Sequence, residues 1–306
     1  MHETLRTGGE GVIFGGCGYA DEWIRYRAMR IQRLWMYIKQ GNEWIIPTVL
    51  WGIIGVPTLR WLWIQWWTND FYSHGVLVVP LALYLGWRLR LPPGRGADAG
   101  LALLAGMTGG YVAALAGHAM YVAALLWIGM AASLVVVFNG WQALRRLWFP
   151  FAFTLLAVPL PFVEAASLPL SQWVGTAAAA VVRLSGIQVL ANGSQISLPQ
   201  AHLVVGAQCS GLRSLIALIT VGALFAYVIQ GPSWCRVLIF LSALPLALVG
   251  NLGRVVSLIV VASMWGAETA FSFYHHYSGF VFFLLVFVGL IAWARGLGCR
   301  NVRDLF

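Results

Sequence analysis

Long apolar runs alternate along this chain with short segments that are polar or basic. Each run is close to the roughly 20 residues that a helix needs to cross a bilayer. The pattern therefore predicts an all-α polytopic membrane protein with about eight transmembrane helices. The predicted spans cover residues 44–66, 73–90, 98–117, 119–139, 147–163, 210–229, 236–263 and 276–294.

The segment between the fifth and sixth runs has a different pattern. Two prolines and three polar side chains interrupt an otherwise span-like stretch: Pro161, Pro169, Glu164, Gln172 and Arg183. This favours a small amphipathic helix on the extracytoplasmic surface over a ninth span. Further along, apolar residues flank Asn192-Gly193. Both residue types tolerate positive φ, so the pair predicts a small β-hairpin just before Cys209.

Composition supports the membrane class. Of 306 residues, 60% are hydrophobic and only 9% are charged, and the mean hydropathy is +0.79. Soluble domains carry about 25% charged residues. The chain also has 16 tryptophans, a residue type that is enriched at membrane interfaces.

The net charge of +9 does not indicate a nucleic-acid partner, because of where the basic residues lie. They cluster in short loops beside apolar runs, as the positive-inside rule expects of cytoplasmic loops. The main members of these clusters are Arg88, Arg90, Arg95, Arg145, Arg146, Arg236, Arg295, Arg300 and Arg303. We therefore predict a multi-pass protein of the plasma (inner) membrane with both termini in the cytoplasm.

Three parts of the chain follow from this orientation. Residues 1–42 form a cytoplasmic N-terminal extension, in which Asp21 to Gln40 have the pattern of a basic amphipathic helix on the membrane surface. Residues 43–295 form the transmembrane domain, and residues 296–306 form a cytoplasmic tail.

The four cysteines have no metal-binding spacing and no Cys-x-x-Cys pair. Cys17, Cys235 and Cys299 fall in segments predicted to be cytoplasmic, so we expect no disulfide framework. Nothing in the sequence requires a metal or an organic cofactor. Cys209 differs from the others because it opens the sixth span from the outer side.

Three polar groups fall at the same predicted depth as the start of the sixth span. They are Cys209, Arg254 in the outer half of the seventh span, and the pair His275-His276 at the start of the eighth. A thiolate is a nucleophile, an imidazole can take and return its proton, and a guanidinium can stabilise an oxyanion. The combination indicates a thiol acyl-transfer site at the outer face of the membrane.

Each of these residues also has a purely structural explanation. A single cysteine in an apolar segment is often a small hydrophobic residue, and interfacial histidines are often only hydrogen-bonded. The position of Arg254 inside a span favours a functional role, although Arg254 could instead form a structural ion pair with Glu268.

Neighbouring residues extend the candidate site. Arg213 could support the site or extend its charge to the membrane surface. Ser210 and Asn251 are further supporting candidates, whereas His74 and His202 are weaker candidates on the same side.

Four stretches of this chain resemble the exosortase/archaeosortase family. They are AQCSGLRSL, NLGRVVSLIV, HHYSGFVFF and the earlier FYSHGVLVVPLALYLGWRLR. The resemblance extends from about Trp61 to Trp293. It implies a multispanning cysteine transpeptidase or protease that cleaves C-terminal sorting signals through a thioacyl intermediate. Such a signal has a Pro-Glu-Pro-like motif, a transmembrane helix and a basic tail.

The resemblance also implies site residues and partners. The family's cysteine, arginine and histidine fall on Cys209, Arg254 and His275, with His276 as an alternative to His275. The partners would be membrane-anchored substrate proteins, an unknown acceptor nucleophile and the lipid bilayer. Arg254 and Arg213 could attract an acidic residue of the sorting motif.

One other class fits the pattern. A non-enzymatic transporter or polysaccharide-export subunit could use Arg254 to bind an anionic solute. Such a protein should tolerate Cys209→Ser, whereas a cysteine transferase should not.

Overall fold

The structure is a computed structural model. It describes residues 44–92, 94, 96–199, 201–204, 206, 210–270, 274–299 and 301, with the side chains of 275 and 276 left out. The predicted N-terminal extension, residues 1–42, lies outside the described residues. The chain divides between Ile54 and Gly55 into two units, and the second unit contains the candidate site.

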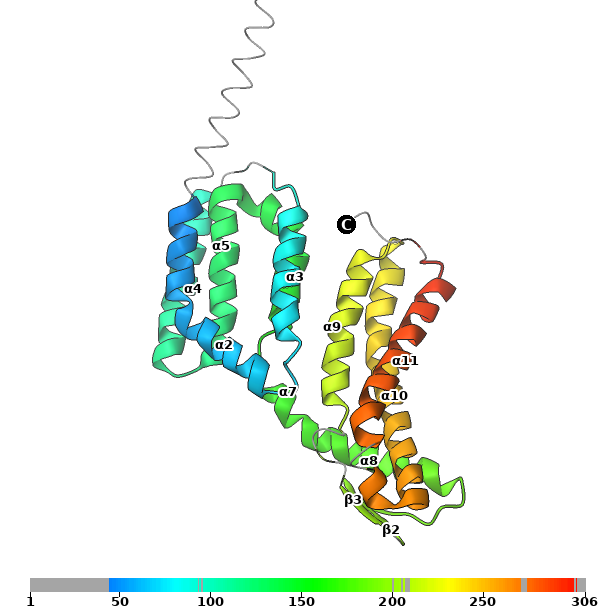
Figure 1. The fold of residues 1–306 in the computed structure, drawn as a ribbon. Coiled ribbons are helices and arrows are strands. Elements are labelled where there is room, and N and C mark those ends of the chain that lie inside the picture. Colours follow the sequence, from blue (N-terminus) through cyan, green and yellow to red (C-terminus); the bar gives the residue numbers. More distant parts are fainter. Residues whose placement is uncertain are drawn as a thin grey trace, which may run out of the picture. The chain divides into compact units, whose positions relative to one another are not determined.

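The second unit is mostly helical, with one small sheet (Figure 1). Its helices are α2 (Val56–Thr68), α3 (Gly75–Arg88), α4 (Ala97–Ala116), α5 (Met120–Arg146), α6 (Trp148–Leu155), α7 (Pro161–Ala165), α8 (Ser167–Arg183), α9 (Leu212–Val228), α10 (Ser233–Thr269) and α11 (His275–Gly296). The strands are β1 (Leu190–Asn192), β2 (Gln195–Leu198) and β3 (Ala201–Val204).

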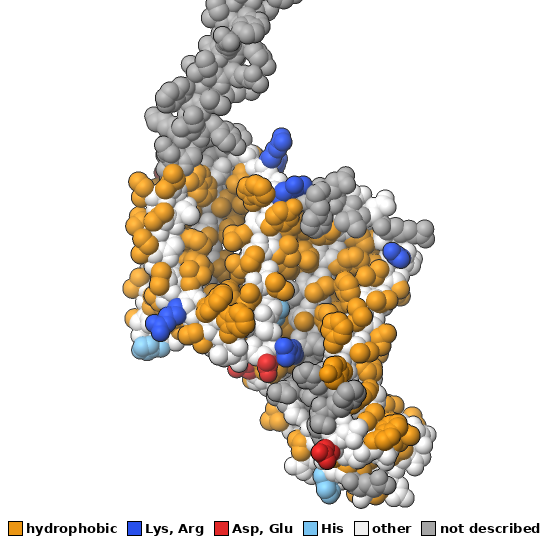
Figure 2. All heavy atoms as spheres, viewed as in Figure 1, with side chains coloured by type: hydrophobic (Ala, Val, Ile, Leu, Met, Phe, Trp, Pro, Cys, Tyr) orange, Lys and Arg blue, Asp and Glu red, His pale blue; other side chains and the backbone are white. Residues whose placement is uncertain are grey.

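Five helical segments are long and apolar enough to cross a membrane: α4, α5, Pro161–Arg183, α10 and Tyr277–Gly296. A sixth is present if Trp44–Ile54 and Val56–Thr68 form one broken span, and α3 and α9 are shorter apolar helices. On the face shown in Figure 2, hydrophobic side chains cover these helices and few charged groups interrupt them. The prediction of a helical multispanning membrane protein is therefore confirmed.

The predicted fifth span, residues 147–163, is not one helix. Helix α6 has only eight residues, about 12 Å of helix, and the chain turns before α7 starts at Pro161. Proline has no N–H and disfavours helical geometry in the residue before it, so Pro159 and Pro161 account for this break. The interrupted stretch that follows does form a helix, α8, and Pro161–Arg183 also meets the length and composition of a span.

The predicted hairpin is present, but the sheet is larger than predicted. Strands β1 and β2 are antiparallel, and Asn192 pairs with Gln195 across a loop of Gly193 and Ser194. The turn is thus one residue later than Asn192-Gly193, and Gly193 takes its positive φ of 59°. A third strand, β3, pairs with β2 and was not predicted.

The sheet is anchored on two helices. Ile196 and Leu203, each buried, pack in one apolar cluster with Val182 of α8 and with Val255 and Ile259 of α10. Strand β3 leads directly into the segment that carries the sixth-span motif. The sheet therefore holds β3, which comes just before this segment, against α10.

Helices α9, α10 and α11 pack closely through small residues. A Cβ atom at Gly250 of α10 would overlap with Val286 of α11, and one at Gly222 of α9 would stand 2.9 Å from Ala243 of α10. Small residues at such positions let helices in a membrane approach each other. The three helices therefore hold their motif residues in a defined register.

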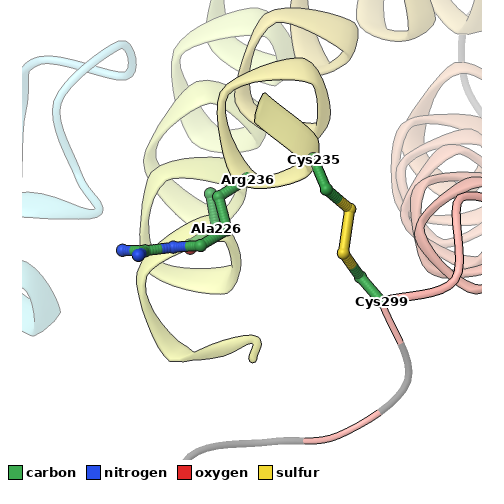
Figure 3. The surroundings of a disulfide bond; sticks show 4 residues. All are labelled: Ala226, Cys235, Arg236 and Cys299. Atoms are coloured by element: carbon green, nitrogen blue, oxygen red, sulfur yellow. A yellow bond between two sulfur atoms is a disulfide. The ribbon is translucent and has the colours of Figure 1, made fainter. Parts of the chain in front are cut away.

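Two cysteines are joined, contrary to the expectation of no disulfide. Cys235, in the first turn of α10, is bonded to Cys299, just beyond α11, and both are buried (Figure 3). The beginning of α10 and the end of α11 meet because the two helices are antiparallel neighbours. Close by, Arg236 donates from Nε to the carbonyl of Ala226 in α9, at 3.0 Å. Sequence spacing alone did not show this meeting of helix ends.

Candidate active site

Arg254 is held at the contact between α10 and α11. Its Nε donates to the Oγ of Ser278 at 3.2 Å, and Ser278 is only 3% exposed. Behind this contact, Ser257 donates to the Arg254 carbonyl at 2.8 Å, and the Tyr274 hydroxyl donates to Ser257 at 2.7 Å. A charged group inside a span needs such polar contacts, and this network connects it to the start of α11.

The guanidinium also lies against Gly279. A Cβ atom at Gly279 would stand 3.4 Å from Nη2 of Arg254. His275 and His276 begin α11, four and three residues before Gly279, and residues at these spacings share a helix face. The backbone therefore places both histidines one turn from the contact with Arg254, while their side chains lie outside the described structure.

Cys209 itself lies outside the described residues, but the residue after it is well anchored. Ser210 is fully buried, and its N–H donates to the carbonyl of Gly206 at 3.0 Å. Its Oγ accepts from the N–H of Leu212 at 3.3 Å and from the Oγ of Ser167 in α8 at 3.4 Å. Ser210 therefore connects α8 to the beginning of α9.

Gly211 brings the start of α9 against α10. It has φ +82° and ψ 0° as the N-cap of α9, a left-handed conformation that glycine adopts without strain. A Cβ atom there would overlap with the carboxamide of Asn251, which is 4% exposed and lies one turn before Arg254. The cysteine motif and the arginine motif are thus in contact through Gly211 and Asn251.

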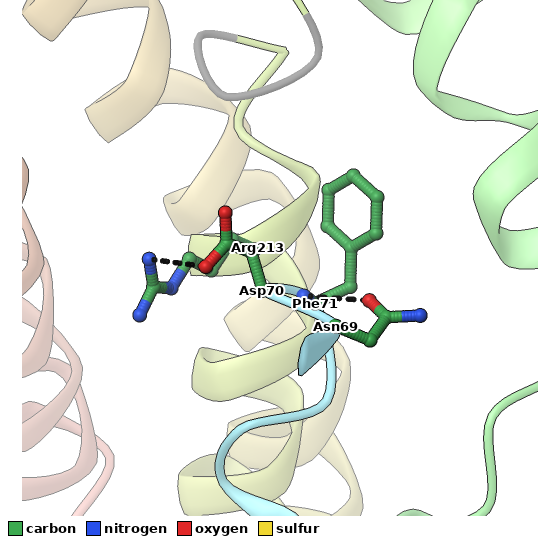
Figure 4. Close-up of polar contacts among 4 residues, drawn as sticks. All are labelled: Asn69, Asp70, Phe71 and Arg213. Carbon is green, nitrogen blue, oxygen red and sulfur yellow. Dashed lines mark hydrogen bonds and ion pairs between the residues drawn. The ribbon is translucent and has the colours of Figure 1, made fainter. Parts of the chain in front are cut away.

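Arg213, in the first turn of α9, makes an ion pair with the turn between α2 and α3. Its Nη1 lies 3.6 Å from Oδ1 of Asp70, and both side chains are 59% exposed (Figure 4). Asp70 was not among the residues predicted from the sequence. The available signal was the polar pair Asn69-Asp70 between two apolar runs.

A cavity of about 980 Å³ lies beside these groups. Arg213, Arg254 and Gly279 line it together with Asn69, Asp70 and Glu164. We call it the site cavity. It brings two arginines and two carboxylates to one space, large enough for several side chains of a bound peptide.

The weaker histidine candidates have other contacts. His74 donates from Nε2 to the carbonyl of Leu156 at 3.2 Å and stacks on Tyr72. His202 of β3 lies 3.1 Å from the hydroxyl of Ser197. These contacts support the α2–α3 turn and the sheet, respectively.

Burial shifts two pKa values in the turn at residues 69–74, which lies outside the membrane-spanning helices. It lowers the pKa of His74, so the neutral imidazole is favoured. It raises the pKa of Tyr72, and the nearby Glu164 carboxylate adds to that rise. The turn therefore contains a neutral histidine and a protonated tyrosine near neutral pH.

Among the described residues, no group of three or more His, Cys, Asp or Glu side chains is placed to hold a metal ion. The site is instead an arginine pair beside the cysteine motif and the histidine pair, in a multispanning helical protein. These features define a class of membrane protein with a polar site between its helices.

The sequence profile of the transmembrane exosortase family matches residues 66–292, most of the chain. The chain therefore belongs to the transmembrane exosortase family. No curated protein and no solved structure matches it. Family membership implies a multi-pass transpeptidase that processes substrate proteins with PEP-CTERM signals.

Proposed function

We propose that this exosortase cleaves the C-terminal sorting signal of its substrates with Cys209 as nucleophile. The Cys209 thiolate attacks the carbonyl carbon of the scissile peptide bond. Arg254 stabilises the resulting oxyanion, and His275 transfers the thiol proton to the leaving amine. The C–N bond breaks, and the new C–S bond leaves a thioacyl enzyme, which an acceptor nucleophile or water then resolves.

The convergence of three sequence motifs carries this proposal. Gly211 packs on Asn251, one turn before Arg254, and Arg254 bonds to Ser278 in the first turn of α11. The residues after Cys209, the arginine and the two histidines are therefore neighbours, although they are distant in sequence. His276 is the alternative proton carrier, since both histidines are within one turn of Gly279.

The chemistry needs each of these residue types. A free thiol has a pKa of about 8.5 and is mostly protonated at neutral pH, so it needs a base such as an imidazole. A guanidinium stays charged and can donate to the oxyanion that forms in the transition state. No metal is needed for these steps.

Basic residues at the helix ends support one orientation of the protein in the membrane. Arg88, Arg145, Arg236 and Arg295 lie in the end turns of α3, α5, α10 and α11, opposite to the sheet (Figure 1). Basic residues favour the cytoplasmic side. We propose that the site cavity faces the extracytoplasmic side of the plasma membrane and that both termini are cytoplasmic.

Tail removal from a co-expressed substrate tests the proposal. The substrate carries the motif, the helix and the basic tail, and cleavage is followed by gel mobility for wild type, Cys209→Ala, Arg254→Ala, His275→Ala and His276→Ala. We expect cleavage to require Cys209, Arg254 and one of the two histidines. His202→Ala is the matched control, because His202 lies on the exposed face of β3 and should leave cleavage unchanged.

One outcome would exclude the mechanism, and another would change one residue in it. Cleavage by Cys209→Ala at the wild-type rate would exclude thiol chemistry. If His276→Ala abolishes cleavage and His275→Ala does not, the proton carrier is His276, and the rest of the mechanism stays intact.

A further inference from the structure

Arg213 and Asp70, which form an ion pair (Figure 4), both line the site cavity. The ion pair joins two segments that are far apart in sequence, the first turn of α9 and the turn between α2 and α3. Arg254 lines the same cavity. A substrate peptide that reaches Arg254 therefore passes close to this pair.

The turn that carries Asp70 is held by bonds of its neighbour Asn69, without Arg213. The Asn69 carbonyl accepts from Tyr72 N–H at 3.0 Å, and its Oδ1 accepts from Phe71 N–H at 3.0 Å. Its Nδ2 donates to Glu164 at 2.6 Å. These bonds fix the turn, so the ion pair is not what shapes it.

The pair is also weak. Both side chains are 59% exposed and the closest N–O distance is 3.6 Å. Ion pairs this exposed contribute little, because water screens the charges and two long side chains must be ordered. Another carboxylate of suitable geometry can therefore replace Asp70 at Arg213.

Arg213 is better placed than Arg254 to bind a carboxylate of the substrate. Arg254 is held by Ser278 and lies against Gly279, which suits a group that acts at the reacting carbonyl. Arg213 is exposed in the cavity, and a guanidinium can bind a carboxylate through two parallel hydrogen bonds.

We propose that Arg213 binds an acidic side chain of the sorting motif and that Asp70 occupies Arg213 until the substrate displaces it. This inference rests on the proposed function and adds a specificity residue and an internal competitor to it. Because Asp70 competes with the substrate for Arg213, it weakens the binding of acidic motifs. It also keeps Arg213 paired when the cavity holds no substrate.

The test compares two substrates that differ only in a glutamate or a glutamine in the motif. The enzymes are wild type, Asp70→Asn and Arg213→Gln, each as the full chain in detergent. For the glutamate substrate, Asp70→Asn should lower KM by roughly two- to fivefold, with kcat unchanged. For the glutamine substrate it should change nothing, and Arg213→Gln should abolish the preference for glutamate.

Glu164→Gln is the matched control. Glu164 lines the same cavity but bonds to Asn69. If the effect of Asp70 is specific to Arg213, Glu164→Gln should leave the ratio of KM values for the two substrates unchanged. An equal effect of both substitutions would show that only the general charge of the cavity matters, which would overturn the proposal.

A binding measurement separates this inference from the proposed function. Fluorescent peptides with glutamate or glutamine are titrated against full-length Cys209→Ala and against Cys209→Ala combined with Asp70→Asn. If only the glutamate peptide binds more tightly to the double variant than to Cys209→Ala, the result supports Asp70 as a competitor, whether or not cleavage is seen. Equal binding of both peptides overturns it, whereas cleavage that does not require Cys209 overturns only the proposed mechanism.

Discussion

At the scale of single residues, the hydroxyl of Ser278 orients Arg254, a cation inside a long apolar helix. Arg254 lies within α10, where a cation is costly unless polar groups surround it. Its Nε donates a 3.2 Å hydrogen bond to the hydroxyl of Ser278, which is itself only 3% exposed. Sequence reasoning selected Arg254 for its place in a span, but it could not select Ser278, because a serine in an apolar run usually bonds within its own helix.

We predict that Ser278→Ala weakens catalysis by Arg254. A hydrogen bond to a charged group contributes about 1.5–3 kcal/mol, so kcat should fall by roughly tenfold or more. KM should change little, because the substrate is not expected to contact Ser278. Ser278→Thr keeps the hydroxyl and should restore most of the activity. If both variants are equally impaired while their thermal unfolding is like wild type, the hydroxyl is not what matters.

His74 should make stability depend on pH. Burial lowers its pKa in the folded protein below the usual value of 6.5. The unfolded chain therefore takes up a proton first as the pH falls. The stabilisation is fully present above pH 6.5 and is lost as the pH falls through the folded pKa. Thermal unfolding between pH 8 and pH 5 measures this loss.

The control for this pH dependence is His74→Gln. Glutamine can donate to the carbonyl of Leu156 but does not titrate. The variant should show a smaller decrease in unfolding temperature between pH 8 and pH 5 than wild type. An identical decrease in both proteins would assign the pH dependence to other groups.

At the scale of elements, the contact between the beginning of α9 and α10 determines where the cysteine motif lies. Gly211 has a positive φ and a neighbour, Asn251, that leaves no room for a Cβ atom. The same motif segment is preceded by β3, which is anchored through Leu203. The described residues on both sides of Cys209 are therefore held against α10.

We predict that Gly211→Ala is destabilising and inactivating. It adds strain at φ +82° and an overlap with Asn251, and strained backbone conformations cost about 1–3 kcal/mol each. The matched control is Gly206→Ala, since a Cβ atom at Gly206 meets no atom within 4 Å. Unfolding temperature and cleavage are measured for both. A Gly211→Ala protein as stable and active as Gly206→Ala would contradict this account of the contact.

The elements also show which features a sequence can reveal. Apolar runs predicted helical spans, and Asn192-Gly193 predicted the hairpin. Both signals depend only on residues that are close together in the sequence. Strand β3 was missed because its four residues carry a pattern too short to recognise and need β2 as a partner. The pairing of Arg213 with Asp70 was also missed, because it too depends on a partner that is distant in sequence.

At the scale of the whole molecule, the disulfide and the basic residues bear on the same question, the orientation in the membrane. Cys235 and Cys299 lie beside Arg236 and Arg295, at the end proposed to be cytoplasmic. Cytosolic thiols are kept reduced. The orientation therefore predicts that these two cysteines are thiols in the cell and that the bond forms on isolation in air.

Acid-quenched cells treated with a maleimide of high mass test this prediction. We expect both Cys235 and Cys299 to be modified after denaturation, without prior reduction. The Cys235→Ser and Cys299→Ser variants identify the bands. If the wild-type cysteines are modified only after reduction, the bond exists in the cell, and the proposed orientation is reversed.

The bond between Cys235 and Cys299 spans 64 residues of sequence, including most of α10 and all of α11. In the oxidised protein, a protease that cuts once within this loop produces two fragments that remain covalently joined. Such a nicked chain runs near full length on a gel until a reductant separates the pieces. Intact and clipped forms of the oxidised exosortase can therefore be told apart only on a gel that is run with reductant.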